Sequence, residues 1–521
     1  MLKLAHVWQG LMAEGHLSAG SLAGLPAEWA DVPISGVVID SRAVQAGSLF
    51  VALRGEKTDG HLYLPEAFAR GAVAAIAEPR GIADYGLEIP DCWIVDCREP
   101  PPPEVPQSPI RNPRVIFLVP DSLAGLQKLA AFWRAQMPAE VVAITGSVGK
   151  TTTKEITANV LAQRFVTLRS EGNLNNEIGL PLTLLRLTAA EERVVLEMGM
   201  YALGEIAHLC QIARPRIGVV TNVGPTHMER LGSIERIAEA KSELVRALPP
   251  AGEGGVAVLN ADDPLVRGMA GLTRARVFTY GLNPAADLWA DEIVSEGLEG
   301  IRFRFHYGAT ALHIKLPLLG RHSVHTALRA AAVGLLEGLS WTEIISGLQE
   351  LRGQLRLLVV PGLRETTLID DTYNASPTSM LAALNLLADI ASAAGTQGKA
   401  RLGLGQRPRC VAVLGDMLEL GSYEEEGHRL VGGRAAQVVN KLVTVGQRAR
   451  WMAAEALAGG MSQADVYPTA DNEEAIALLQ GLIRPGDLIL IKGSRALAME
   501  RIVDALARPP KSKGGHQQAE S

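Results

Sequence analysis

The sequence predicts a three-domain α/β protein whose central and C-terminal domains are built around mostly parallel sheets. The chain has 521 residues, 47% of them hydrophobic, which is too long for a single core. From about residue 141, short apolar β-branched runs alternate with longer stretches of helical periodicity, a pattern typical of α/β units. We expect an N-terminal α/β domain over residues 1–119, a central nucleotide-binding domain over 120–353 and a Rossmann-like α/β domain over 354–521.

Eight apolar runs are the clearest strand candidates. They are VVAIT (141–145), RVVLEM (193–198), IGVVTNV (217–223), VAVLN (256–260), TTLID (366–370), CVAVLG (410–415), LVTVG (442–446) and DLILIKG (487–493). Three segments have too little apolar content to join a core. We expect a Pro-rich loop over residues 98–109, a flexible Gly-rich loop over 392–409 and a disordered polar tail over 508–521.

Composition excludes several classes of protein. The formal charge of −6 gives no basic excess, so nucleic acid is not an expected partner. The four scattered cysteines lack the spacing of a zinc site and are expected to be reduced: Cys92, Cys97, Cys210 and Cys410. No signal-peptide core and no run of about 18 apolar residues is present, so we expect a cytoplasmic protein with no membrane insertion.

The stretch AITGSVGKTTTKE (143–155) resembles a phosphate-binding loop between a strand and a helix, as in P-loop NTPases. Glycines permit positive φ, so backbone N–H groups can turn toward an anion, and the next helix adds its N-terminal dipole. Lys150 would reach the β and γ phosphates, and the Thr151 hydroxyl would ligate Mg²⁺. The usual first glycine is replaced by Ile144, which falls inside the strand. The predicted ATP-binding segment comprises Thr145, Gly146, Ser147, Val148, Gly149, Lys150, Thr151 and Thr152.

A glycine-rich turn can also serve only to pack a helix against a sheet, so we looked for partner groups at the ends of later strands, where α/β sheets hold ligands. Glu197 closes one strand, His227 follows another, and Lys241 lies on the helical segment IERIAEAKSEL. Taken singly, Glu197 could be a helix cap or a surface carboxylate, His227 a loop histidine and Lys241 a solvated cation.

Taken together, these motifs resemble the Mur ligases, the ATP-dependent amide-forming enzymes of peptidoglycan synthesis. The similar segments are TGSVGKTTT (145–153), GNLNNEIGLPLTLL (172–185), EMGM (197–200), THMERLGS (226–233), AKSE (240–243) and GRHSVHTAL (320–328). The loop pattern of this family is TGxxGKTTT, so the absence of glycine at the position of Ile144 is a variant that the family shares.

Four further segments resemble the branch of the family that adds D-alanyl-D-alanine. They are the start IDSRAVQAGSLFVALRGEKTDGH (39–61), which is similar to its UDP-sugar-binding region, and IDDTYNASPTSM (369–380), GDMLELG (415–421) and IKGSRALAME (491–500). The resemblance implies a bacterial ATP-dependent ligase that adds D-alanyl-D-alanine to UDP-N-acetylmuramoyl-tripeptide through an acyl phosphate, the last cytoplasmic step of peptidoglycan precursor synthesis. A monomer is expected.

The resemblance also implies roles for individual residues. Lys150 and the loop would hold ATP, with Arg356 on the γ-phosphate and Asp371 on the ribose. Thr151 and Glu197 would hold one Mg²⁺ and His227 a second, and Lys241 would be carbamylated and serve as a metal-side ligand. The expected catalytic residues are Lys150, His227, Lys241 and Arg356. The expected substrate-binding residues are Ser41, Arg42, Asn175, Asn176, Asn374, Ser494 and Arg495.

The chain departs from the family at Ser323, Thr326 and Ser376, where asparagine is usual, so contacts near the adenine or the substrate would differ. Two alternatives stay open. One is another Mur-type ligase, such as a diaminopimelate-adding enzyme, a folylpolyglutamate synthetase or a cyanophycin synthetase. The other is a non-catalytic nucleotide-binding relative.

Overall fold

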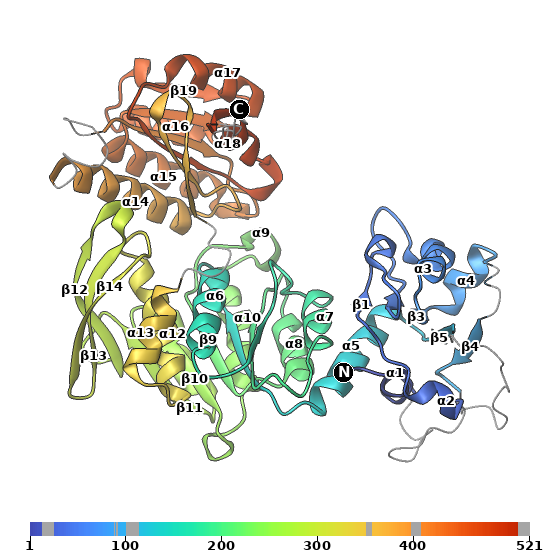
Figure 1. The fold of residues 1–521 in the computed structure, drawn as a ribbon. Coiled ribbons are helices and arrows are strands. Elements are labelled where there is room, and N and C mark those ends of the chain that lie inside the picture. The colour runs from blue at the N-terminus through green and yellow to red at the C-terminus, as the bar shows by residue number, and fades with distance from the viewer. Residues whose placement is uncertain are drawn as a thin grey trace, which may run out of the picture. The chain divides into compact units, whose positions relative to one another are not determined.

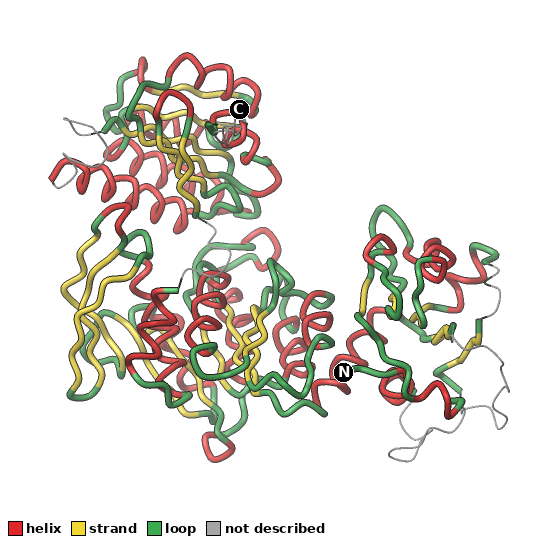
Figure 2. The backbone as a smooth tube through the Cα atoms, in the orientation of Figure 1, coloured by secondary structure: helices red, strands yellow, loops and turns green. Residues whose placement is uncertain are grey.

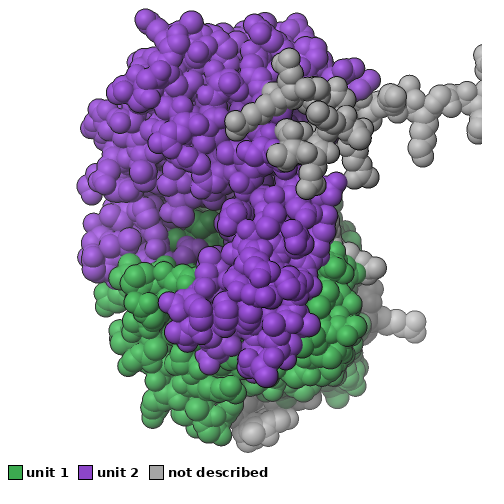
Figure 3. Space-filling model, turned by 90° about the vertical axis from the view of Figure 1, so that its left-hand side faces the viewer, with its two compact units in different colours: residues 1–221, 239–279, 329–350 green, residues 222–238, 280–328, 351–521 purple. Residues whose placement is uncertain are grey.

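The computed structural model describes residues 1–12, 25–87, 89, 92–99, 114–350, 357–396 and 408–508. Arg356 and most of the segments expected to be loops or tail (98–109, 392–409 and 508–521) lie outside these residues. The chain divides into two compact units, coloured separately in Figure 3. The first contains residues 1–221, 239–279 and 329–350, and the second contains 222–238, 280–328 and 351–521.

The first unit opens with a five-stranded parallel sheet in the order β1-β2-β3-β5-β4 (Figure 1). Its strands are β1 (Val37–Val38), β2 (Leu49–Val51), β3 (Ala74–Ala77), β4 (Trp93–Asp96) and β5 (Val115–Leu118). The accompanying helices are α1 (Leu4–Leu11), α2 (Ala27–Ala30), α3 (Leu64–Ala69) and α4 (Pro79–Asp84). Phe50, Phe68 and Ile116 are buried in its core, so this part has the hydrophobic centre of an α/β domain.

The same unit contains the sheet that carries the phosphate loop. Its parallel strands are ordered β10-β9-β6-β8-β7. Their bounds are β6 (Glu140–Thr145), β7 (Thr167–Arg169), β8 (Arg193–Glu197), β9 (Ile217–Val220) and β10 (Val256–Asn260), followed by β11 (Arg276–Gly281). The four strands predicted here are confirmed. Ile144 lies in β6 and is fully buried, so the position where the usual pattern has glycine belongs to the strand.

Helices alternate with these strands along the chain (Figure 2). They are α5 (Ser122–Ala135), α6 (Lys150–Leu161), α7 (Gly179–Leu184), α8 (Glu205–Ala213), α10 (Ile234–Ala247), α11 (Pro264–Gly268) and α13 (Trp341–Gln349). A parallel strand needs a crossover before the next, and these helices supply it. The carboxyl ends of β6, β8 and β9 therefore lie at one edge of the sheet, where α/β proteins place their ligands.

The amino ends of the same strands carry a charged cluster. Arg193 begins β8 and Arg216 immediately precedes β9, and both pair with the buried carboxylate of Glu337. Arg216 also pairs with Glu140 at 2.6 Å. The two arginines neutralise the buried charge of Glu337 at the amino edge of the sheet, which is the edge opposite the phosphate loop.

The second unit contains a six-stranded sheet in the order β15-β16-β20-β17-β18-β19. Its strands are β15 (Leu358–Pro361), β16 (Thr367–Asp370), β17 (Cys410–Gly415), β18 (Lys441–Val445), β19 (Val466–Thr469) and β20 (Leu488–Lys492). Only β15 runs antiparallel to its neighbour. The helices are α14 (Pro377–Thr396), α15 (Glu424–Val438), α16 (Arg450–Ala458), α17 (Asn472–Leu482) and α18 (Glu500–Leu506). The four strands predicted in this part are confirmed.

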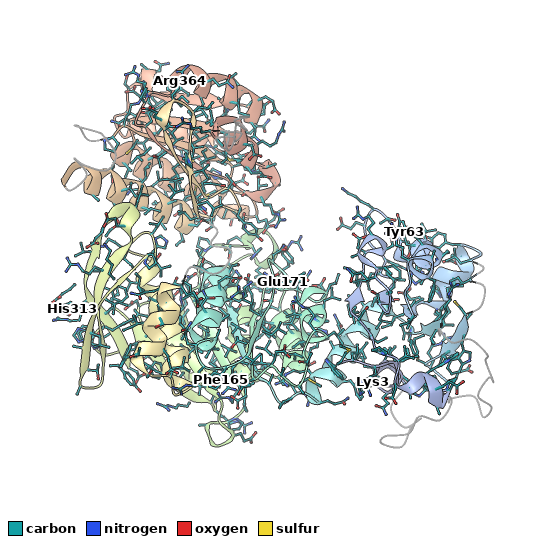
Figure 4. All side chains as sticks on the ribbon, in the orientation of Figure 1. Lys3, Tyr63, Phe165, Glu171, His313 and Arg364 are labelled. Carbon is teal, nitrogen blue, oxygen red and sulfur yellow. The ribbon has the colours of Figure 1, made fainter. Side chains whose placement is uncertain are left out.

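An antiparallel meander in the second unit was not among the strand candidates. It consists of β12 (Leu288–Ser295), β13 (Ile301–Tyr307) and β14 (Thr310–Leu316), where Figure 4 labels His313. Buried Phe303 and Phe305 alternate with charged Arg302 and Arg304 on β13. Such alternation leaves one face in water, so these strands lack the continuous apolar runs by which the parallel strands were found. The remaining helices are α9 (Met228–Leu231) and α12 (Ser323–Leu336).

Two predictions from composition can be compared with the fold. None of the four cysteines forms a disulfide, as expected. Within the described ranges, no helix combines the length and apolar character needed to cross a membrane.

Candidate active site

The phosphate loop joins β6 to α6, and its glycines have conformations that other residues resist. Gly146 has φ of 146°, and a Cβ atom there would lie 1.9 Å from Oγ1 of Thr221. Gly149 has φ of 84° and is the N-cap residue of α6. Both positions therefore require glycine, and the turn delivers the N-terminus of a 12-residue helix to the carboxyl edge of the sheet.

Neighbouring side chains hold the loop in shape. The Thr145 hydroxyl donates to the carbonyl of Met198 at 2.9 Å, and the Thr221 hydroxyl donates to the carbonyl of Val148 at 2.8 Å. Nζ of Lys150 donates to the carbonyl oxygens of Gly146 at 2.7 Å and of Ser147 at 3.3 Å. The cation of Lys150 therefore lies over the loop, beside the backbone that would hold a phosphate.

Glu197 ends β8 with its side chain 1% exposed, which excludes a surface carboxylate. Its Oε2 accepts a hydrogen bond from the Thr151 hydroxyl at 2.6 Å, and its Oε1 accepts one from the Asn175 amide at 2.8 Å. A buried carboxylate beside a hydroxyl offers the hard oxygen ligands that Mg²⁺ prefers.

These two residues fit a magnesium ion that is shared with a nucleotide. In the described part of the chain, no three His, Cys, Asp or Glu side chains gather closely enough to form a complete metal site. Mg²⁺ usually takes one or two protein ligands and fills its other positions with phosphate oxygens and water. The pair of Thr151 and Glu197 is the donor set expected for that case.

Lys241 lies on α10 and is 2% exposed, so the solvated lysine considered from the sequence is wrong. Burial, together with the charge of Lys150, holds the pKa of the Lys241 amine well below its usual value. No carboxylate contributes to this shift. The lowered pKa favours the unprotonated form of the amine relative to an exposed lysine.

The other candidates for ATP and metal binding belong to the second unit. His227 is the N-cap residue of α9 with φ of 58°, and its Nδ1 lies 2.7 Å from Oε2 of Glu419. Asp371 follows β16, and its carboxylate pairs with Nζ of buried Lys492 at 2.7 Å. Lys492 also donates to the carbonyl of Asn374 at 2.8 Å. It therefore fixes the segment that carries the candidates Asp371 and Asn374.

Two further candidates follow β20 in the second unit. The Ser494 hydroxyl oxygen accepts a hydrogen bond from the backbone N–H of Leu418 at 2.9 Å. Arg495 donates to the Tyr373 hydroxyl at 3.2 Å and lies 5.1 Å from the centre of its ring. Ser494 therefore holds the backbone of the segment GDMLELG, which contains Leu418. The guanidinium of Arg495 lies over the ring of Tyr373.

The N-terminal candidates lie on a short 3₁₀ helix, η1 (Ser41–Ala43). Arg42 pairs with Asp40 at 2.6 Å, and its hydrogen bonds lower the pKa of Asp40 to about 2. Ser41 donates to Glu66 at 3.3 Å. Arg42 is strongly exposed, and its guanidinium is already paired with the Asp40 carboxylate.

The two candidate asparagines of GNLNNEIG, Asn175 and Asn176, have different contacts. Asn175 donates to Glu197 as described above, and its carbonyl accepts from the N–H of Gly199 at 2.8 Å. Oδ1 of Asn176 accepts from the N–H of Gly179 at 2.9 Å, at the start of α7. Asn176 therefore holds the backbone at the start of α7, and Asn175 holds the candidate metal ligand.

Two of the positions where the family usually has asparagine have local hydrogen bonds. The hydroxyl of Ser376 accepts from the N–H of Ser379 at 3.4 Å, and the Ser379 hydroxyl accepts from the N–H of Ser376 at 2.9 Å. Serine can replace asparagine here because both residues cap helices well. Ser323 donates to the carbonyl of Leu319 at 2.6 Å, and Thr326 is buried.

Sequence reasoning missed four residues that support the candidates: Lys154, Thr221, Glu419 and Lys492. Lys154 was detectable, since GKTTTKE places it one helical turn after Lys150. The other three contact partners that lie far away in the sequence, and no spacing rule identifies such pairs.

Three family models match the chain. They are "Mur ligase family, catalytic domain" over residues 33–112, "Mur ligase middle domain" over 144–334 and "Mur ligase, glutamate ligase domain" over 355–495. The chain is also 36% identical over 518 residues to the UDP-N-acetylmuramoyl-tripeptide--D-alanyl-D-alanine ligase of Mycobacterium tuberculosis, covering 94% of this chain and 95% of that protein. The chain belongs to the Mur ligase family.

Solved structures of Mur ligases also match the chain. A crystal structure of MurF from Acinetobacter baumannii matches with a TM-score of 0.73 at 30% identity, covering 90% of this chain and 93% of that one. MurF ligase from Thermotoga maritima, solved in complex with ADP, matches with a TM-score of 0.71 at 29% identity, covering 91% and 97%. The family and the three-domain α/β architecture predicted from the sequence are confirmed.

Proposed function

We propose that this Mur ligase uses ATP to add D-alanyl-D-alanine to UDP-N-acetylmuramoyl-tripeptide. The observation that carries the proposal is the phosphate loop beside the buried Thr151–Glu197 pair, in a chain that matches the ligase of that name along 94% of its length. The product would be the UDP-linked pentapeptide of peptidoglycan precursor synthesis, made in the bacterial cytoplasm by a monomeric enzyme.

ATP is the nucleotide that the loop would bind. The positive φ angles of Gly146 and Gly149 and the start of α6 offer backbone N–H groups to phosphate oxygens. The ADP complex of the similar Thermotoga maritima ligase supports this assignment. Lys150 would neutralise the β and γ phosphates, with Asp371 on the ribose and Arg356 on the γ-phosphate.

Magnesium would be held by Thr151 and Glu197, and a second ion by His227. When bound, Mg²⁺ supplies positive charge to the phosphoryl oxygens during transfer. Asn175 keeps the Glu197 carboxylate oriented through its 2.8 Å hydrogen bond. A carboxylate held by such a hydrogen bond needs less reorganisation during the reaction.

The reaction would proceed in two steps, with bonds to the substrates only. In the first, a carboxylate oxygen of the tripeptide forms a bond to the γ-phosphorus and the bond from phosphorus to ADP breaks. In the second, the amine of D-alanyl-D-alanine forms a C–N bond, the acyl C–O bond breaks, phosphate leaves and the amine loses a proton. Lys150 stabilises charge on the transferred phosphoryl group.

Lys241 would be carbamylated. Its neutral nitrogen forms a bond to the carbon of CO₂ and loses a proton, which converts a buried amine into an anionic oxygen ligand. The low pKa that burial gives this lysine supports the modification, because only an unprotonated amine can react. The carbamate would then face the metal side of the site.

Replacing Lys241 tests the carbamate. We expect Lys241→Ala to lower kcat at least about 100-fold, because an anionic group near the phosphoryl oxygens is lost. Short-chain carboxylic acids should restore part of the activity, since they supply the missing carboxylate. Rescue by an amine instead, or unchanged activity in Lys241→Ala, would contradict a carbamate.

The remaining substrate contacts are assigned by resemblance. Ser41 and Arg42 would bind the UDP-sugar end, and the exposed guanidinium of Arg42 supports a role toward an anion. Asn175 and Asn176 would lie toward the tripeptide. The second-unit residues Asn374, Ser494 and Arg495 would complete substrate binding.

Phosphate release from ATP tests the proposed reaction. It should require both UDP-N-acetylmuramoyl-tripeptide and D-alanyl-D-alanine, and mass spectrometry should find the pentapeptide product. Release with folate plus glutamate would favour a folylpolyglutamate synthetase, and release with diaminopimelate a relative that adds that residue. Nucleotide binding without release under any condition would favour a non-catalytic relative.

A further inference from the structure

Lys154 is a fully buried cation on α6 to which the proposed reaction gives no role. It lies one helical turn after Lys150, on the helix whose first turn also carries Thr151. A lysine side chain rarely lies entirely inside a protein unless its charge is paired and its hydrogen bonds are made. The partners of Lys154 therefore indicate what it does.

The ammonium of Lys154 holds the backbone that follows β7. Its Nζ donates to the carbonyl of Ser170 at 2.5 Å and to the carbonyl of Gly172 at 3.3 Å. It pairs with Glu155, whose Oε1 lies 3.0 Å away and whose Oε2 lies 3.0 Å from Nε of Arg169. Figure 4 labels Glu171, which lies between the two residues held by Lys154.

The held segment in turn contacts Glu197. The Ser170 hydroxyl oxygen accepts a hydrogen bond from the backbone N–H of Glu197 at 3.2 Å. Five residues further along, the Asn175 amide donates to the Glu197 carboxylate at 2.8 Å. Lys154 thus fixes the stretch of chain that contacts both the backbone and the side chain of Glu197.

These contacts form a closed path that begins and ends on α6. The path runs from Lys154 to Ser170, from Ser170 to Glu197, and from Glu197 to the Thr151 hydroxyl at 2.6 Å. Each side chain on the path is buried. Moving one member would displace the next, because no water shell is available to replace a lost hydrogen bond.

A purely structural role is the simplest alternative. A buried ion pair is weak evidence for stability, because an apolar side chain of similar size often serves as well. Lys154 would then only satisfy carbonyl groups at the end of β7. The closed path argues for more, since Lys154 is linked through Ser170 to Glu197, and Glu197 contacts Thr151.

We propose that Lys154 is a positioning residue that sets the Glu197 carboxylate against Thr151 for magnesium-dependent nucleotide binding. The proposal rests on the proposed function for its role in turnover. It does not depend on the peptide substrates for its effect on nucleotide affinity.

Calorimetric titration of the full chain tests the proposal with ADP as probe, once with MgCl₂ and once with EDTA. We expect Lys154→Met and Ser170→Ala each to weaken ADP binding about 10- to 100-fold with Mg²⁺, as loss of groups that orient metal ligands usually does. In EDTA their affinities should stay within about 2-fold of wild type, because the loop backbone is unchanged. The Mg²⁺ concentration for half-maximal phosphate release should rise in the same variants.

Lys441→Met is the matched control. Lys441 also pairs with a carboxylate, Asp465 at 2.6 Å, and donates to a backbone carbonyl, that of Ala464 at 3.1 Å, at the start of β18. Its loss should alter neither titration. Ser170→Ala keeps the carbonyl that Lys154 binds and removes only the hydroxyl that contacts the N–H of Glu197, so it tests that link of the path. If Lys154→Met fails to fold, Lys154→Arg takes its place in both titrations.

The proposal is overturned if Ser170→Ala and a folded Lys154→Met match Lys441→Met in both titrations, or if they lose affinity equally in EDTA. It is also overturned if Mg²⁺ does not change the affinity of the wild type for ADP. A wild type that binds ADP with Mg²⁺ but makes no product from the two peptide substrates would refute the proposed function alone.

Discussion

At the scale of single residues, the phosphate loop shows why one glycine is indispensable and another replaceable. Gly146 has a positive φ and lies against Thr221, whereas Ile144 has its side chain packed inside the sheet. The usual glycine can be lost because a strand residue needs no special backbone conformation. The loop keeps glycine only where the backbone requires it.

Replacing Gly146 with alanine should be costly. The new Cβ would lie 1.9 Å from Oγ1 of Thr221, at a backbone with φ of 146°. We expect the free energy of unfolding to fall by about 2 to 4 kcal/mol, from strain and overpacking together. Urea unfolding measures the change.

Gly204→Ala is the control for backbone strain alone. Gly204 has φ of 90°, and a Cβ there would meet no atom within 4 Å. We expect a loss of only about 1 kcal/mol. Equal losses in the two variants would show that the contact with Thr221 is unimportant.

At the scale of elements, two clusters hold strands and loops in place. Glu337 pairs with Arg193 at the start of β8 and with Arg216 just before β9, at the amino edge of the central sheet. In the second unit, Nε2 of His428 accepts a hydrogen bond from the N–H of Met417 at 3.0 Å, and Nδ1 donates to the carbonyl of Glu424 at 2.6 Å. His428 thus fixes the segment GDMLELG, which carries Glu419.

Glu337→Ala should destabilise the first unit. Its loss leaves Arg193 without its nearest carboxylate, although Glu140 still pairs with Arg216. We expect the free energy of unfolding to fall by about 3 kcal/mol, because a charge removed from water loses its partner. Thermal and urea unfolding both report this change.

Glu171→Ala is the control for Glu337→Ala, because it removes an ion pair that is exposed to solvent. Glu171 pairs with Arg186 at 2.8 Å, but the side chains are 66% and 47% exposed. Removing this pair should cost less than about 1 kcal/mol. If Glu337→Ala were equally mild, the cluster would contribute no more than a surface ion pair.

His428 should make stability depend on pH. Burial lowers the pKa of His428 below that of an unfolded histidine, so the unfolded chain binds more protons in that range. Its contribution is fully present above about pH 6.5 and is lost as the pH falls toward the folded pKa. The difference in unfolding free energy between wild type and His428→Gln should therefore shrink on acidification. A constant difference between pH 7.5 and pH 5.5 would contradict this prediction.

At the scale of the whole molecule, we propose that the protein is a monomer. Sedimentation equilibrium should give the mass of one 521-residue chain over a wide range of concentration. A mass that doubles as concentration rises would contradict this expectation.

The sequence by itself determined eight strands of the central and C-terminal sheets, the phosphate loop and the family; it did not predict β1 to β5, β7 or β19. The eight strands, the loop and the family depend on local features: apolar runs such as β6, glycines at fixed offsets such as Gly149, and ordered motifs. It did not predict the antiparallel meander of β12 to β14, because strands that expose one face to solvent lack a continuous apolar run.

Only the tertiary structure decided the environments of the candidate side chains. Lys241 is read as solvated from its helix alone, yet it is buried and its pKa is lowered. Asn175 is a candidate for substrate binding from the sequence, and only the structure shows that it also donates to Glu197, 22 residues away. Burial and hydrogen bonding depend on segments that meet only when the chain folds, so the chemistry of a group cannot be read from its neighbours in sequence.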